Sequence, residues 1–142
     1  HTDFTERSKP FEMNYALDVK NHIISVDKKM YINPEWDRDW ANYSIDTARY
    51  NHFAFEHKTH SFKTTTINVP AGYTVSRLPD AVNIKNEYFT FKLVYEKKGN
   101  TIVYTNEIIL PKAYLHRNQI PAWNEAVEKV TAFYDSYIVL TK

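Results

Sequence analysis

Three histidines and a glutamate that lie close together are the first candidates for metal chemistry. They are His52, Glu56, His57 and His60. A zinc site needs three or four ligand atoms that converge on one ion at about 2 Å. On an extended chain His57 and His60 point to opposite faces, because successive side chains alternate. This spacing is poor for joint ligation, so we predict solvent-exposed loop histidines and no bound metal.

Other catalytic chemistry has few candidate residues. The chain of 142 residues contains no cysteine, which excludes disulfides, thiolate ligands and a cysteine nucleophile. No serine lies in a nucleophile-elbow sequence. The two glycines, Gly72 and Gly99, are too few for a phosphate-binding loop. We therefore predict no catalytic residue and no cofactor, and we expect that the chain is not itself an enzyme.

Aromatic residues are the better candidates for binding. The chain has eleven Tyr, eight Phe and three Trp, a content that β-sheet cores and cross-strand pairs largely explain. Exposed indoles also stack on sugar rings, so Trp36 and Trp40 indicate a carbohydrate-binding module as an alternative function. The competing structural interpretation is that both rings close the edge of a sandwich.

The segment from residue 33 to residue 60 has no clear periodicity and mixes aromatic with charged residues. Interface centres favour such mixtures of aromatic residues and arginine. We predict that this segment faces a preceding domain, or a protein or glycan partner, although the aromatic residues could equally only close the sheet edge. The predicted surface comprises Trp36, Arg38, Trp40, Tyr43, Arg49 and Tyr50, with Glu35, Asp37 and Asp39 as further charges that are hard to bury.

The element that must organise the chain is a hairpin over residues 87–110. Its apolar residues alternate, which is typical of strands with one buried face. Gly99-Asn100 is a two-residue turn sequence, because Gly and Asn tolerate positive φ. Folding about this turn places Lys92 opposite Glu107 on the outer face. The predicted inner face consists of Phe89, Phe91, Leu93, Tyr95, Ile102, Tyr104, Asn106, Ile108 and Leu110, of which Asn106 is the polar exception.

Further strands are predicted over residues 11–19, 22–26, 30–32, 61–69, 73–76 and 82–84, with a last one or a tail at 137–140. Val69 to Gly72 has the chemistry of a type I turn. Residues 34–43 fit either a short helix that begins at Pro34 or a loop across a sheet edge. The recurrence of turns every 8 to 12 residues is typical of a sandwich or barrel.

A helix is predicted near residues 119–136, because the apolar period changes to 3.6 there. Pro121 fits its first turn. Its apolar stripe should lie on a sheet and consists of Trp123, Ala126, Val127, Val130, Phe133, Tyr134 and Tyr137. The predicted fold class is therefore mainly β, an antiparallel β-sandwich with one C-terminal amphipathic helix packed on the sheet.

Length and charge set the domain organisation. We expect residues 1–9 to be a polar lead or linker from an upstream domain, and residues 10–142 to form a single domain. The formal net charge of +1 argues against nucleic-acid binding. No apolar run approaches the ~20 residues of a membrane span, so we predict no membrane insertion by this chain.

The order of several short motifs resembles a known family. Pro70-Ala71-Gly72-Tyr73 and Leu78-Pro79 separate two strands, and Tyr31-Ile32-Asn33-Pro34 ends an earlier one. With Arg49 and the closing Ile138-Val139-Leu140, the chain resembles the C-terminal domain of unknown function of bacterial transglutaminase-like (transglutaminase/protease-like) envelope proteins. One departure is Asn51-His52, where that family usually has a proline soon after the arginine.

The resemblance implies a function that the residues alone do not. It implies a non-catalytic accessory domain, whose partner is the upstream transglutaminase-like domain of the same polypeptide. Any catalytic Cys, His and Asp would lie in that domain, in a periplasmic, envelope or secreted protein.

Overall fold

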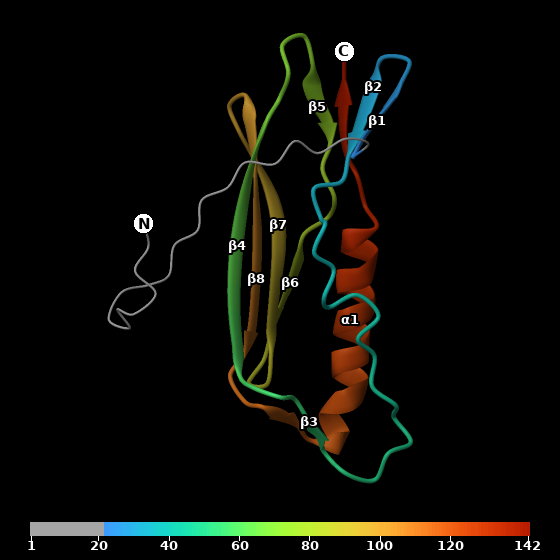
Figure 1. The fold of residues 1–142 in the computed structure, drawn as a ribbon, viewed down its shortest axis with the longest axis vertical. Coiled ribbons are helices and arrows are strands. Elements are labelled where there is room, and N and C mark those ends of the chain that lie inside the picture. The colour runs from blue at the N-terminus through green and yellow to red at the C-terminus, as the bar shows by residue number, and fades with distance from the viewer. Residues whose placement is uncertain (1–21) are drawn as a thin grey trace, which may run out of the picture.

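The computed structural model describes residues 22–142, and its largest element is a long antiparallel sheet (Figure 1). The strand order is β4-β8-β7-β6, with the bounds β4 Thr59–Asn68, β8 Thr101–Leu110, β7 Thr90–Lys98 and β6 Val82–Lys85.

The central hairpin of this sheet, β7 and β8, is confirmed together with its register. Lys92 pairs with Glu107, and Gly99 adopts a φ of +61° in the two-residue turn. All the residues predicted for the inner face are buried, and the polar Asn106 is buried among them. The hairpin therefore provides one wall of the core.

The helix α1, Ile120–Tyr134, lies on the inner face of the long sheet and follows a short 3-10 turn, η1, Arg117–Gln119. The ring of Trp123 lies 5.3 and 5.4 Å from those of Phe89 and Phe91. In the last turn of the helix, Phe133 stacks on Tyr95 and Tyr104. These aromatic contacts join the helix to the sheet along its whole length.

A smaller antiparallel sheet lies beyond the C-terminal end of the helix in Figure 1. Its order is β1-β2-β10-β5, with the bounds β1 Ile23–Val26, β2 Lys29–Ile32, β10 Ile138–Thr141 and β5 Thr74–Arg77. Ile32, Ile138 and Leu140 point from this sheet into the core. Near the other end of the helix, β3, Phe53–Ala54, pairs with β9, Tyr114–Leu115.

The predicted fold class is confirmed. The chain is mainly β, with antiparallel sheets in two layers and one C-terminal helix in contact with the sheet strands. Among residues 22–142, no helix has the length and apolar character needed to cross a membrane.

Two local predictions were wrong. The turn after β4 spans residues 70–73, one residue later than predicted, because the Tyr73 amide donates to the Pro70 carbonyl. Gly72 then occupies the third position with a φ of +82°, which is typical of a type II turn. Tyr137 does not extend the helical stripe and is 42% exposed. The reason is that Ser136 closes the last turn on the Phe133 carbonyl and the chain leaves the helix there.

Residues 34–43 form a loop with turns and no helix, so the second of the two alternatives holds. The predicted strand over residues 11–19 and the polar lead over residues 1–9 lie outside the described residues. The boundary at residue 10 therefore stays a prediction.

Candidate functional site

The six residues predicted as an interaction surface lie at three separate places. They follow β2 in the chain and belong to the segment that runs beside α1 toward β3 (Figure 1). The contacts at each place determine which of them are available to a partner.

Trp40 and Tyr43 close the edge of the core. The Trp40 ring lies 6.0 Å from that of Trp123 and 6.1 Å from that of Phe91. The Trp123 indole donates a hydrogen bond of 2.8 Å to the Tyr43 carbonyl, and the Tyr43 ring stacks on Phe55. For these two residues the geometry is that of the sheet-edge interpretation.

Arg49 and Tyr50 lie near the start of the helix. Tyr50 is 88% exposed, and the Arg117 guanidinium sits over its ring at 5.7 Å. The Arg49 guanidinium lies over the Phe53 ring at 5.1 Å. Both arginines thus contact aromatic faces, the geometry of cation–π interactions.

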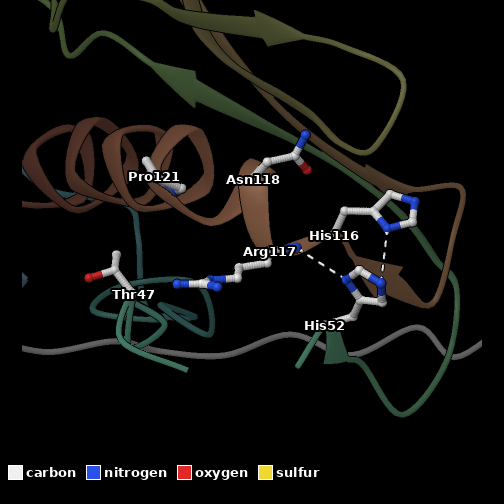
Figure 2. Close-up of a pocket in the computed structure, with 6 residues that line it drawn as sticks. All are labelled: Thr47, His52, His116, Arg117, Asn118 and Pro121. Atoms are coloured by element: carbon white, nitrogen blue, oxygen red, sulfur yellow. Dashed lines mark hydrogen bonds between the residues drawn. The ribbon is translucent and has the colours of Figure 1, made fainter. Parts of the chain in front are cut away.

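A cavity of about 530 Å³ opens beside these residues (Figure 2). Two of its histidines come from distant parts of the chain: His52 precedes β3, and His116 lies between β9 and η1. The His52 Nε2 and His116 Nδ1 atoms are 3.4 Å apart. The Arg117 backbone amide donates to His52 Nδ1 at 3.2 Å. The cavity is lined by Thr47, His52, His116, Arg117, Asn118 and Pro121.

The histidine cluster considered from the sequence is not brought together. His52 turns to His116, whereas His60 on β4 lies 3.1 Å from the Glu107 carboxylate. Within residues 22–142, no group of three or more His, Asp or Glu side chains is arranged to hold a metal ion.

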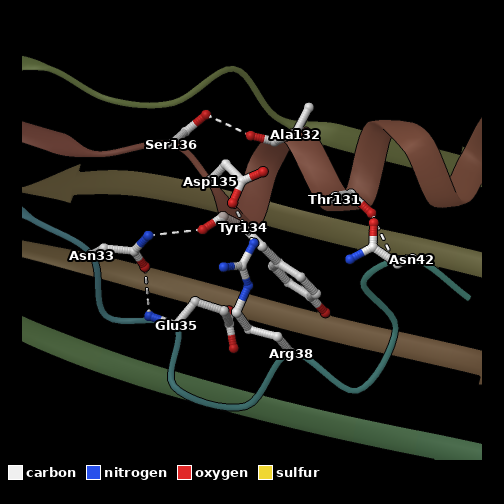
Figure 3. Close-up of polar contacts among 9 residues, drawn as sticks. All are labelled: Asn33, Glu35, Arg38, Asn42, Thr131, Ala132, Tyr134, Asp135 and Ser136. Carbon is white, nitrogen blue, oxygen red and sulfur yellow. Dashed lines mark hydrogen bonds and ion pairs between the residues drawn. The ribbon is translucent and has the colours of Figure 1, made fainter.

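Arg38 belongs to a set of contacts that hold the segment to the end of the helix (Figure 3). Its guanidinium forms an ion pair with Asp135. The Asn33 side chain donates to the Tyr134 carbonyl at 2.8 Å and accepts from the Glu35 amide at 2.9 Å. Arg38 is therefore engaged within the chain.

A buried carboxylate holds the same segment to the long sheet. The Glu35 side chain is only 1% exposed. The Lys63 ammonium lies 2.7 Å from one of its oxygens, and the Tyr104 hydroxyl donates to the other. Burial, together with the bond and the charge of Glu35, raises the pKa of Tyr104, while burial is also the main cause of the raised pKa values of Tyr95 and Tyr134. The sequence predicts Glu35 to be among the charges that are hard to bury, and this prediction is wrong because Lys63 balances its charge and Tyr104 donates a hydrogen bond to it.

Beside this cluster, two further acidic residues of the segment share a small cavity of about 50 Å³. The neighbouring Asp37 carboxylate, through its charge and a hydrogen bond, raises the pKa of Asp39. Lys63 and Asn106 line the same cavity, so the interior polar residues of the sheet gather under this loop.

Trp36 lies at the opposite end of the helix from Tyr50. It is 55% exposed and packs edge-to-face on His22, the residue before β1. Ile24 on β1 pairs with Tyr31 on β2, which pairs in turn with Val139 on β10. The outward face of this sheet thus carries a row of apolar residues. We call it the outer β1 face, and it comprises Ile24, Val26, Tyr31, Tyr137 and Val139.

A protein-family model matches residues 28–140. Its description is "Domain of Unknown Function with solved-structure structure (DUF3858)". The chain belongs to this family. Neither a curated protein nor a solved structure matches it. The matched region of the DUF3858 domain runs from β2 through the helix to Leu140 in β10, and β1 precedes it.

The arrangement of the DUF3858 domain determines what each cluster can do. Glu35, Lys63 and Tyr104 satisfy one another, and such a closed polar cluster fixes a loop. The outer β1 face offers apolar area for a partner, and the histidine cavity offers hydrogen-bond donors. Sequence reasoning missed His116 and Lys63, because their partners lie 64 and 28 positions away in the chain. Only Lys63 could have been found from the sequence. It lies two and four positions before Thr65 and Ile67, so the alternation of the strand places all three on its inner side.

Proposed function

We propose that this DUF3858 domain is a non-catalytic accessory domain that docks on a transglutaminase-like domain preceding it in the same polypeptide. The observation that carries the proposal is the outer β1 face. Ile24 and Val26 are each about half exposed although they lie in a regular strand. Exposed apolar groups that are adjacent on one face are typical of interaction sites.

The position of this face supports the choice of partner. Residues 1–21 connect to β1, so a domain earlier in the polypeptide is tethered to the fold at this strand. Tethering raises the effective concentration of such a partner, and a modest apolar contact then suffices. Trp36 extends the exposed apolar surface beside β1, and large aromatic side chains often dominate interface energies.

The remaining parts of the proposal rest on the family resemblance and on residue chemistry. The domain acts without catalysis of its own, and a cysteine nucleophile, with its histidine and aspartate, belongs to the preceding domain. Its location is the periplasm, the cell envelope or the extracellular space. Trp36 and Tyr50 lie near opposite ends of α1, a 15-residue helix that is about 22 Å long. This separation favours protein docking over a glycan platform, which needs its aromatic rings in one plane.

Hydrogen exchange on this chain and on the polypeptide that includes the preceding domain tests the proposal. We expect slower exchange in residues 22–36 and 137–141 of the longer protein, with little change at the edge strand β4. Ile24→Lys should remove that difference. Phe62→Lys is the matched control, because Phe62 is also an exposed apolar strand residue, 64% exposed on the far face of the long sheet.

Exchange rates of β1 and β2 that are the same in both proteins would refute docking at this face. Equal effects of the two lysine substitutions would show that the contact is not specific to β1.

A further inference from the structure

The histidine cavity carries side chains suited to one class of ligand. We propose that it binds a small ligand through a carboxylate group. The cavity lies at the start of α1, away from the outer β1 face, so the inference is independent of the docking proposal. Its volume of about 530 Å³ exceeds that of a single ion and has room for the body to which a carboxylate is attached.

The hydrogen bonds of the two histidines leave one ring N–H group without a partner among residues 22–142, on the side of His116 that faces away from the Arg117 guanidinium in Figure 2. His52 Nδ1 accepts from the Arg117 backbone amide, so the proton of the neutral ring lies on Nε2. That Nε2–H donates to His116 Nδ1, which places the proton of His116 on its own Nε2. Within residues 22–142, no protein acceptor is bonded to this last N–H group. The pair therefore ends in a donor.

The charge of the cavity is a single positive one. Arg117 stays protonated in proteins. Among the described residues it has no carboxylate within 4.0 Å, and its guanidinium contacts the exposed Tyr50 ring instead. None of the six lining residues is acidic. One fixed positive charge with neutral imidazoles matches a monoanion better than a phosphate dianion.

The other lining groups fit the same ligand. Thr47 and Asn118 also line the cavity, and their hydroxyl and amide groups are hydrogen-bond donors. A carboxylate only accepts hydrogen bonds, and the planar guanidinium can bond both of its oxygens at once. Pro121 contributes an apolar wall for the carbon atoms of the ligand.

NMR titration of the isotope-labelled chain tests the inference with defined probes. These are N-acetylglutamate methylamide and galacturonate as carboxylates, their neutral counterparts N-acetylglutamine methylamide and galactose, and inorganic phosphate. We expect saturable shifts of the His52 and His116 ring signals and of the Arg117 and Asn118 amides with at least one carboxylate. Its neutral counterpart should bind roughly tenfold more weakly or not at all, because the charge-assisted bonds are lost. Binding of the glutamate probe alone identifies an amino-acid ligand, binding of galacturonate alone a sugar acid, and binding of both a site that recognises the carboxylate itself.

Two variants and one control assign the binding to this cavity. Arg117→Gln should weaken binding of the carboxylate probe roughly tenfold, and Thr47→Val should weaken this binding less. Unchanged amide shifts of β3 and β9 show that each variant keeps its fold. Arg77→Gln, on β5, should leave the affinity unchanged. The inference fails if neither carboxylate gives saturable shifts, if the neutral probes bind equally well, if phosphate binds more tightly than both carboxylates, or if Arg117→Gln retains full affinity.

Discussion

Two lysine–glutamate pairs in this domain have nearly the same length but very different surroundings, and they allow one substitution to be compared in both. Lys63 Nζ lies 2.7 Å from Glu35, and Lys129 Nζ lies 2.6 Å from Glu125. The Glu35 side chain is 1% exposed and that of Glu125 is 67% exposed. We predict that Lys63→Met destabilises the domain strongly and that Lys129→Met does so only slightly.

The magnitude follows from what each substitution leaves behind. Methionine keeps most of the apolar stem of lysine and removes the charge. Without Lys63, the Glu35 carboxylate retains the Tyr104 hydroxyl as a partner but has almost no contact with water. Removing one partner of a buried pair costs about 3–5 kcal/mol. Lys63 itself is 32% exposed, so water can replace part of its interaction, and we expect about 2–3 kcal/mol. Glu125 is hydrated before and after the change, so its loss is small.

Urea unfolding at neutral pH measures both effects. With a slope of about 1–3 kcal/mol per molar urea, a loss of about 2–3 kcal/mol should lower the midpoint of Lys63→Met by about 0.7–3 M. Lys129→Met should leave the midpoint close to that of the parent chain. The double variant Lys63→Met/Glu35→Gln should recover part of the loss, because the uncompensated charge is then gone. Equal midpoints for the two single variants would refute the reasoning that burial of Glu35 decides the outcome.

Two further predictions concern the helix and the buried phenols. Val130→Asp places a charge at a fully buried position against the sheet and should lower the free energy of unfolding by on the order of 3 kcal/mol or more. Lys129→Asp, at the neighbouring position, should change the denaturation midpoint little. Similar losses for the two variants would mean that the helix presents another face to the sheet. Burial raises the pKa values of Tyr95, Tyr104 and Tyr134, so the unfolded chain releases these protons first as the pH rises above about 10. The contribution to stability is fully present below that pH and is lost above it, by up to about 1.4 kcal/mol per pH unit for each phenol. Urea midpoints between about pH 9 and about pH 11, followed with the ultraviolet absorbance of tyrosinate, measure this loss, and a midpoint independent of pH would contradict it.

The features predicted well from the sequence are those set by neighbouring residues. The register of β7 and β8 follows from the Gly99-Asn100 turn and from the alternation of apolar residues on either side of it. The buried stripe of α1 follows from a period of 3.6, and it holds from Trp123 to Tyr134. The turn at Pro70 was misplaced because Pro and Gly suit both common turn types, and only the φ of Gly72 separates them.

The candidate sites depend on residues that the chain brings together over long distances. Aromatic content alone could not show that Trp40 would meet Trp123 while Tyr50 stayed in solvent. The pairing of His52 with His116 depends on the two-residue ladder of β3 and β9, which is too short to give a sequence pattern. The burial of Glu35 depends on Lys63 and Tyr104, on two different strands of the long sheet. Such placements follow from the packing of whole elements, and no local periodicity in the sequence indicates them.

The position of β10 has a consequence for the order in which the chain acquires structure during synthesis. This strand is the last in the chain, yet it lies in the interior of the small sheet, between β2 and β5. The strand of Ile32 can pair with that of Ile138 only after about 100 more residues have been synthesised. At about 5–20 residues per second, a ribosome needs roughly 5–20 s to make that interval. Throughout it the β1–β2 hairpin, apolar on both faces, has no neighbouring strand from this sheet to cover it, and a lone hairpin is only marginally stable. We expect the smaller sheet to be the last part of the domain to form, only after β10 has emerged from the ribosome.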